Sequence, residues 1–188
     1  MSILSVNAGS SSLKFALYPI QGVGMEACIG EAEVTGNIEG LEPSGQPRIS
    51  FCATGQAKES ADVVVQPAQD VFDAALNTLK ALLASRFAHL RVQAIAHRVV
   101  HGGAFYNSSV RVTPEVMAQL ATLNALAPLH QPHNLAGINA FAESFGDVRF
   151  NLAAEAQNKA ATRIRLKVPT NVGKGHWVAR KCDGNRST

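Results

Sequence analysis

The first twenty residues contain two hydrophobic runs separated by a small polar segment. Residues 3–6 are Ile, Leu, Ser and Val, a mainly apolar run, and residues 7–12 are Asn, Ala, Gly and three Ser. After them Leu13, Phe15 and Leu17 alternate with smaller or more polar residues. An alternation with a period of two is typical of a strand, whereas a helix repeats every 3.6 residues. The pattern therefore predicts a β-hairpin whose turn lies in residues 7–12.

The next segment keeps strand character but is interrupted by turn-forming residues. Residues 25–34 and 48–52 are predicted to be strands, and residues 63–65 a further short one. Glycine and proline recur through residues 36–47, which favours turns there. The first 65 residues are thus expected to form mostly antiparallel sheet.

Residues 67–87 predict a helix that packs on this sheet. Pro67 suits the first turn of a helix, and Asp70 complements the positive end of its dipole. Large apolar residues then recur every three or four positions, which places them on one buried face: Phe72, Leu76, Leu79, Leu83 and Phe87. The β-branched segment 92–100 follows and predicts a strand that returns to the sheet.

Two more helices are expected in the second half of the chain. Thr113 is a favourable N-cap and Pro114 a favourable first residue, and apolar residues follow them at helical spacing. Residues 126–134, interrupted by two prolines, are predicted to form a loop. A last helix follows the loop and has these residues on one face: Leu135, Ile138, Ala142 and Phe145. The order of elements predicts an α/β domain.

Composition is that of a globular chain. The 188 residues are 46% hydrophobic and contain no apolar run of 18 residues, so no membrane span is expected. The N-terminus lacks the basic and apolar regions of a signal peptide. The three cysteines, an odd number without C-x-x-C spacing, favour reduced thiols over a disulfide framework or a zinc site. We therefore expect a cytoplasmic protein.

Charge divides the chain at about residue 148. Residues 1–148 contain 8 Lys and Arg and 12 Asp and Glu, a net charge of −4, whereas residues 149–188 contain 9 and 2, a net charge of +7. The composition predicts two regions, 1–148 and a basic tail, 149–188. A poorly ordered tail accounts for this composition, and electrostatic binding of nucleic acid is the alternative, although no nucleic-acid-binding motif is present.

The serine-rich turn is the first candidate site. A turn of this kind presents backbone N–H groups and hydroxyls, and Gly9 lets a phosphate approach the backbone closely. The Walker and dinucleotide-binding loops need further glycines and a following helix, and neither pattern is present. A turn without any ligand explains the same residues, because turns favour Gly, Asn and Ser.

Arg98 is the second candidate, because it lies in an apolar strand just before a Gly-Gly loop. A guanidinium keeps its charge, so a buried position requires an anionic partner. That partner is either a core carboxylate in a structural ion pair, or a substrate carboxylate or phosphate that the planar guanidinium binds with two hydrogen bonds. His97, His101 and His130 are candidates to join such a site, and each also suits a structural role.

Three separated segments resemble the signature stretches of acetate kinases, a family that includes propionate and butyrate kinases. They are residues 6–15, VNAGSSSLKF, residues 97–103, HRVVHGG, and residues 126–138, LAPLHQPHNLAGI. Their order and spacing also match, and the resemblance covers residues 3 to about 148. It implies a ribonuclease-H-like fold of the actin, sugar kinase and Hsp70 superfamily, a mixed sheet with flanking helices, present here as a truncated N-terminal domain.

The resemblance implies transfer of the γ-phosphoryl group of ATP to acetate, or to propionate, which yields ADP and acetyl phosphate in the case of acetate. It implies Mg²⁺ as the cofactor and a cytoplasmic homodimer, with no membrane and no nucleic-acid partner. It assigns Asn7 to the metal site. It assigns three residues to the ATP phosphates: Ser10, Ser12 and Lys14. It assigns four residues to the carboxylate substrate: Arg98, Val100, Leu129 and His130.

The chain departs from the family pattern after residue 148. A family member continues with an apolar strand and a Phe-Asp-Thr-x-Phe-His segment that carries the catalytic Asp, whereas this chain reads RFNLAAEAQN from residue 149. No catalytic residue is therefore assigned, and Glu155 is not given that role. We expect an acetate kinase fragment of impaired or no activity with an out-of-frame or disordered tail. The alternative is a non-catalytic remnant that binds anions or another chain.

Overall fold

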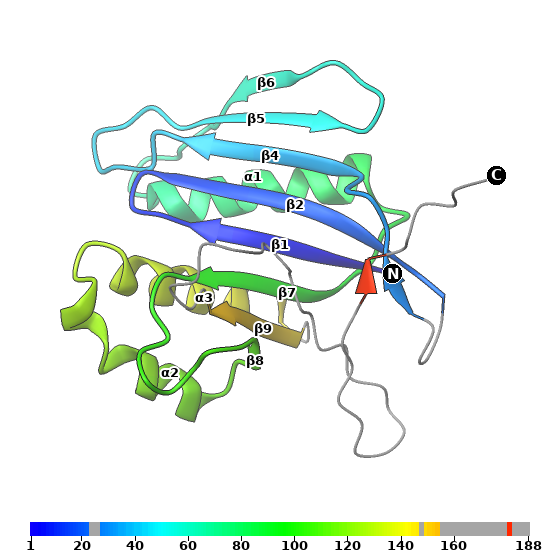
Figure 1. Ribbon diagram of the computed structural model, residues 1–188. Coiled ribbons are helices and arrows are strands. Elements are labelled where there is room, and N and C mark those ends of the chain that lie inside the picture. The colour runs from blue at the N-terminus through cyan, green and yellow to red at the C-terminus, as the bar shows by residue number, and fades with distance from the viewer. Residues whose placement is uncertain (23–26, 147–148, 155–179, 182–188) are drawn as a thin grey trace.

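A computed structural model describes residues 1–22, 27–146, 149–154 and 180–181, and the last two ranges by their backbone alone. Its strands form one mixed sheet (Figure 1). The strands are β1 (Ser2–Ala8), β2 (Ser12–Gln21), β3 (Cys28–Ile29), β4 (Val34–Glu39), β5 (Arg48–Ala53), β6 (Glu59–Asp62), β7 (Val92–Val99), β8 (Val110–Arg111), β9 (Arg149–Ala154) and β10 (Arg180–Lys181). The helices are α1 (Val71–Arg86), α2 (Pro114–Ala121) and α3 (Gln131–Phe145), with a short 3₁₀ turn at Asn124–Leu126.

The strand order in the sheet is β6-β5-β4-β2-β1-β7-β9-β8. Neighbouring strands from β6 to β1 are antiparallel, β1 and β9 both run parallel to β7, and β8 is antiparallel to β9. β3 pairs with the end of β2, and β10 pairs with β3. The mixed sheet, antiparallel on one side and parallel on the other, confirms the expected architecture.

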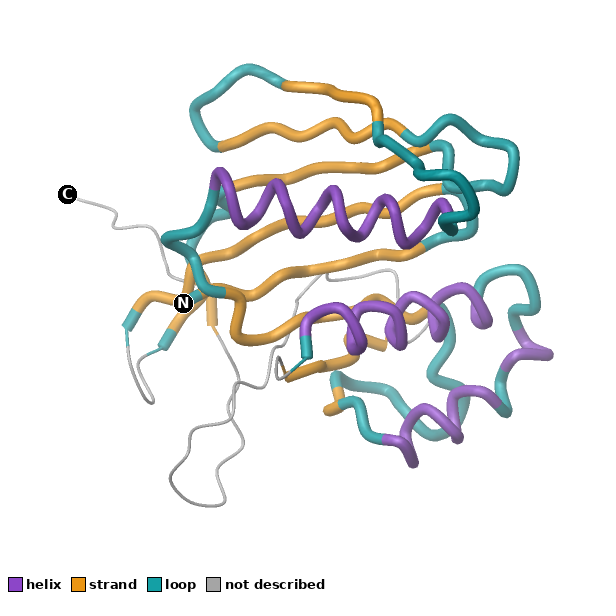
Figure 2. Tube along the Cα trace, turned by 180° about the vertical axis from the view of Figure 1, so that it is seen from behind, coloured by secondary structure: helices purple, strands orange, loops and turns teal. Residues whose placement is uncertain are grey.

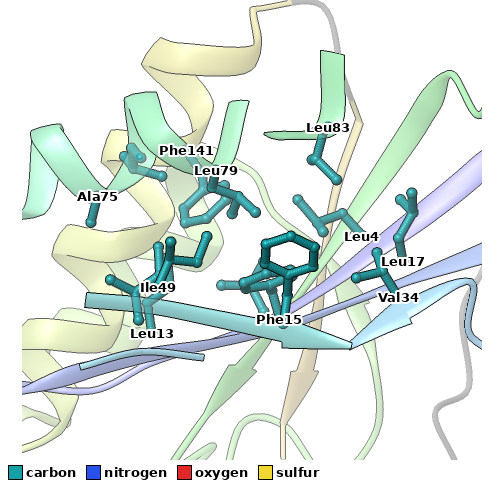
Figure 3. Close-up of a cluster of buried hydrophobic side chains, with 14 of the residues drawn as sticks. Leu4, Leu13, Phe15, Leu17, Val34, Ile49, Ala75, Leu79, Leu83 and Phe141 are labelled. Carbon is teal, nitrogen blue, oxygen red and sulfur yellow. The ribbon is translucent and has the colours of Figure 1, made fainter. Parts of the chain in front are cut away.

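Helices α1 and α3 pack against one face of the sheet (Figure 2). The core between them includes Leu4, Phe15, Leu79 and Phe141, all buried (Figure 3). A second buried cluster joins Val99 of β7 to α2 and α3. None of the described helices is long and apolar enough to cross a membrane.

The predicted hairpin, the first helix and the strand after it are confirmed, although α1 begins later than expected. Asp70 is its N-cap, and the Asp70 carboxylate accepts hydrogen bonds from the Phe72 amide at 2.8 Å and the Asp73 amide at 3.2 Å. These bonds satisfy amides that have no partner inside the helix, so they fix its start at Val71 and not at Pro67.

Two predicted element boundaries are wrong for reasons that depend on neighbouring strands. Residues 34–39, which include part of the expected turn region, form β4 and pair with β2 and β5. Gly36 is needed there as a small residue, because a Cβ at this position would stand 2.2 Å from a carbon of the Phe15 ring. The strand expected at residues 63–65 lies instead at Glu59–Asp62, where polar residues pair with β5 at the sheet edge.

Helix α3 begins inside the segment predicted to be a loop. It starts at Gln131, and Pro132 lies in its first turn. The missing N–H of proline costs nothing there, since that amide would have no partner within the helix. The start of α3 thus falls four residues before the apolar periodicity that predicted it.

The prediction of reduced thiols is wrong for one cysteine. Cys28 is disulfide-bonded. Cys52 is free and exposed, as expected.

The described part of the predicted tail belongs to sheets. β9 pairs in parallel with β7 over residues 149–154, and β10 pairs with β3. The other residues of the predicted tail lie outside the described ranges, so their disorder and out-of-frame origin stay predictions, as does a boundary at residue 148.

Candidate functional site

The turn between β1 and β2 is shorter than expected and is held by two backbone hydrogen bonds. It consists of residues 9–11, because Asn7 and Ser12 belong to the two strands. The Gly9 amide donates to the Ser12 carbonyl at 2.8 Å, and the Leu41 amide donates to the Ser11 carbonyl at 3.1 Å. The Gly9 amide is therefore used within the turn. Ser10 and Ser11 are exposed, and Ser12 is half-buried at the start of β2, on the same face as Lys14.

Gly9 leaves open space at this turn. Its φ lies outside the left-handed region, and an added Cβ would meet only the Ser12 carbonyl oxygen, at an ordinary contact distance of 3.4 Å. The fold itself would therefore tolerate alanine here. Glycine keeps the backbone accessible to an approaching group, as a phosphate-binding turn requires.

Asn7 and Lys14 lie side by side on the face of the sheet opposite α1 and α3. They are directly opposite each other in the β1–β2 pair. Their neighbours Val6, Ala8 and Leu13 belong to the core beneath the helices. Because side chains alternate along a strand, Asn7 and Lys14 must point to the other face.

Arg98 lies on the same face of the sheet as Asn7 and Lys14, and it is exposed there and not buried. Arg98 is exposed, and the buried ionisable residue of β7 is His97, at 1% exposure. Val6 is aligned with His97 in the parallel β1–β7 pair, so Asn7 and Arg98 follow on neighbouring strands. The expected burial of Arg98 is thus wrong, but its position beside Asn7 brings the arginine to the serine turn.

His97 lies on the helix side and contributes no positive charge. Its ring meets Phe141 edge-on, with ring centroids 5.1 Å apart. Burial lowers the pKa of His97 to about 3, because the buried ring has no water around it to solvate a positive charge. The imidazole is therefore neutral near pH 7, whereas Lys14 and Arg98 carry positive charge on the opposite face.

The remaining substrate-binding candidates gather near the start of α3, which lies at the same end of the sheet as the turn after β1 and the end of β7 (Figure 1). His130 is the exposed N-cap residue of α3, and Leu129 before it is 75% exposed. Val100 is half-buried just after β7. His101 instead accepts a hydrogen bond at Nδ1 from the Gly103 amide at 2.9 Å, so it stabilises its own loop.

Two buried amides at this end were missed by sequence reasoning. Asn134 is 5% exposed, and Gln131 is fully buried; both lie in the first turn of α3. Asn134 contacts the ends of β1 and β7, and Gln131 contacts the loop after β7 and α2. Two amides beside an apolar helical stripe were the available signal, but that stretch was predicted to be loop.

Asn7 is the candidate metal ligand that the family resemblance assigns, and its surroundings can be compared with what a metal needs. The described residues contain no cluster of three or more His, Cys, Asp or Glu side chains that could hold an ion. Asn7 offers an amide oxygen on the face that also carries Lys14. Mg²⁺ commonly binds one or two protein oxygens and completes its shell with water and phosphate oxygens, so Asn7 fits as one ligand of a phosphate-bound ion.

The fold and this cluster define the class: an α/β domain that presents hydroxyl and basic groups at one end of a mixed sheet. A sequence model of the acetokinase family matches residues 2–157. The chain belongs to the acetokinase family. The match continues past residue 148 and includes all of β9.

Relatives and solved structures agree with this assignment. The chain is 38% identical over 141 residues to an acetate kinase of Rhodopseudomonas palustris, covering 75% of this chain and 34% of that protein. It is 39% identical over 150 residues to an acetate kinase of Acholeplasma laidlawii, covering 79% and 35%. The structure matches Porphyromonas gingivalis acetate kinase with a TM-score of 0.66 at 26% identity, covering 81% of this chain and 37% of that one.

A propionate kinase structure from Francisella tularensis is similar with a TM-score of 0.65 at 27% identity, covering 81% of this chain and 36% of that one. Both kinds of kinase therefore share the mixed sheet with flanking helices. The chain spans about a third of the length of the curated relatives it matches.

Proposed function

We propose that this chain carries the phosphate-loop part of an acetate kinase active site. The proposed reaction is ATP plus acetate to ADP plus acetyl phosphate, or its reverse. The observation that carries the proposal is the row of Lys14, Asn7 and Arg98 on three neighbouring strands, beside an open serine turn. Family membership supports it.

The chemistry requires positive charge more than a base. Acetate is already ionised at neutral pH, so a carboxylate oxygen can attack the γ-phosphorus of ATP without losing a proton. The P–O bond to ADP breaks as the new bond forms, and charge is spread over the phosphoryl oxygens. Lys14 and Arg98 would offset the repulsion between the two anions, and Ser10 and Ser12 would hold the ATP phosphates by hydroxyl donation.

The acyl group of the substrate would lie near the start of α3. In this proposal Arg98 holds the carboxylate, Val100 and Leu129 contact the methyl group, and His130 lies beside them. The same residues accommodate acetate and propionate, and the relatives include kinases named for each.

Mg²⁺ bound to ATP would be held in part by Asn7, and when bound it neutralises phosphate charge. We also propose that the protein acts in the cytoplasm and that it pairs as a homodimer, as the family resemblance implies.

Activity of these 188 residues by themselves is expected to be low. The sequence contains no Phe-Asp-Thr-x-Phe-His segment, and the matched part of the chain covers only 34–35% of the family relatives. The second candidate is therefore a non-catalytic module that keeps the anion site. It is favoured by the same two facts, and binding measurements separate it from an inert fold.

The test combines a coupled kinase assay with titration calorimetry on the 188-residue chain. We expect turnover far below that of a full-length relative, but measurable binding of Mg-ADP and of acetate. Lys14→Met and Arg98→Gln should each weaken binding at least tenfold, about 1.4 kcal/mol.

Arg48→Gln is the matched control, because Arg48 lies on the same face but forms an exposed ion pair with Asp62 at 2.8 Å. It should leave both affinities nearly unchanged. If wild-type chain binds neither ligand, or if all three variants behave alike, the proposed site is wrong.

A further inference from the structure

Asn134 bridges the ends of two parallel strands with one side chain. Its Nδ2 donates to the Ala8 carbonyl at 2.5 Å, and its Oδ1 accepts from the Val100 amide at 3.1 Å. Ala8 is the last residue of β1, immediately before the serine turn, and Val100 follows Arg98 by two residues. The amide thus contacts both segments to which the proposed ligands would bind.

The bridge stands where direct pairing between the strands has ended. The last aligned pair between β1 and β7 is Val6 with His97. Beyond it, the Asn134 amide provides a donor and an acceptor in the way a peptide group would in a sheet ladder. The two hydrogen bonds of the Asn134 side chain therefore help to set the distance between the backbone at Ala8 and the backbone at Val100.

A second contact holds α3 at the same place. Gly137, one turn after Asn134 and buried, lies so near Ala8 that an added Cβ would stand 2.7 Å from the Ala8 Cβ. Any larger residue would push the helix away from β1. The close approach of Gly137 and the hydrogen bond of Asn134 both involve Ala8. Together they fix the position of α3 along β1.

We infer that Asn134 is a positioning residue: it fixes the separation between the serine turn, residues 9–11, and the Arg98–Val100 segment, and so couples phosphate binding to carboxylate binding. This inference rests on the proposed function. The Asn134 amide does not itself touch the proposed ligands, and it acts through the two backbone segments it holds.

Gln131 provides a matched control. It lies in the same helical turn and is fully buried, and its Nε2 donates to the His101 carbonyl at 3.1 Å and the Leu120 carbonyl at 3.3 Å. It therefore links α2 to the loop after β7, and within the described residues its side chain makes no hydrogen bond to β1. Losing either amide leaves buried backbone groups without a partner and destabilises the fold, but only Asn134 joins the two proposed binding segments.

The experiment measures amide hydrogen exchange and ligand binding in the 188-residue chain. Asn134→Ala should speed exchange of the Gly9 and Val100 amides, both hydrogen-bonded in the wild type, at least tenfold and abolish the effect of Mg-ADP on acetate affinity. Gln131→Leu is expected to lose a similar amount of stability to Asn134→Ala. It should nevertheless leave the exchange of the serine turn and the effect of Mg-ADP on acetate affinity near wild type.

Asn134→Asp adds a pH readout that a general packing defect would not give. A protonated carboxyl can donate to the Ala8 carbonyl, and a carboxylate cannot. Burial raises the pKa of such a carboxyl, so this variant should recover slow exchange and coupling at about pH 5.5 and lose them at about pH 8.

Two results would overturn the inference: unchanged exchange of the serine turn in Asn134→Ala, or equal effects of the Asn134 and Gln131 changes. If Asn134→Ala does not fold, the pH dependence of Asn134→Asp decides, and a flat profile counts against the inference. If the wild-type chain binds neither ligand, the proposed function fails, while the exchange data still decide whether Asn134 holds the turn.

Discussion

Adjacent residues of β7 have opposite electrostatic roles because they lie on opposite faces of the sheet. Arg98 is exposed on the face without helices, beside Asn7. His97 is buried against Phe141, and burial lowers its pKa to about 3. The strand therefore presents its permanent cation to the candidate site and keeps its titratable group neutral within the core.

The buried His97 should make stability depend on pH. Its folded pKa, about 3, lies below the unfolded value near 6.5, so the unfolded chain binds the extra proton between these values. His97 therefore costs no stability above about pH 6.5, and the free energy of unfolding falls by up to about 1.4 kcal/mol per pH unit below it. Urea unfolding between pH 7 and pH 5 measures this slope.

His97→Phe removes the titration while it keeps a ring beside Phe141, so the slope between pH 7 and pH 5 should decrease by about one proton. His133→Gln, at an exposed position in α3, is the control and should keep the wild-type slope. Hydrogen bonds from Arg86 and Thr113 lower the pKa values of Glu59 and Glu115, so those groups lose their contribution only at lower pH. An unchanged slope in His97→Phe would show that another group is responsible.

At the scale of elements, local periodicity predicted some parts of the fold well and missed others. The first hairpin, α1 and β7 follow from the spacing of their own apolar residues. In β4, Gly36 leaves room for the Phe15 ring of β2. β6 is a polar strand at the edge of the sheet. Those features depend on partners distant in sequence, so no local pattern reveals them.

The candidate site shows the same division. Motif resemblance identified its basic and hydroxyl residues, but the face on which Arg98 lies followed only from the β1–β7 register. The bridging role of Asn134 depends on a contact with Ala8, 126 positions away. Sequence therefore predicted which residue types assemble, and the structure supplied the partners that hold them.

The packing of β4 on β2 gives a prediction at this scale. Gly36→Ala places a methyl group into the Phe15 ring, since the built Cβ lies 2.2 Å from it. We expect a loss of about 1–3 kcal/mol in the free energy of unfolding, as overpacking of a core usually costs. Denaturant unfolding of the two purified proteins measures the difference.

A double variant tests whether the ring is the cause. Phe15→Leu alone should destabilise the fold by leaving a cavity, but Gly36→Ala in the Phe15→Leu background should cost much less than in wild type. Equal costs in the two backgrounds would mean that Gly36 is needed for backbone freedom and not for the ring contact.

At the scale of the whole molecule, the family match and the distribution of charge along the chain point in different directions. The family match runs to residue 157, and β9 occupies a place beside β7. Yet net charge changes from −4 in residues 1–148 to +7 in residues 149–188. A change of sequence origin from about residue 149 stays a prediction, and the family match to residue 157 limits how early it can occur.

We predict that the gene contains a shift of reading frame close to the codons for residues 149–157. The basic composition and the missing Phe-Asp-Thr-x-Phe-His segment both belong to residues 149–188, and one shift of reading frame would explain both. Sequencing the gene and translating all frames downstream should reveal that segment, followed by the remainder of an acetate kinase, in a shifted frame. Restoring the frame should then raise kinase activity by orders of magnitude over the 188-residue chain. Downstream DNA that encodes no such segment in any frame would contradict the prediction and leave a true basic tail as the explanation.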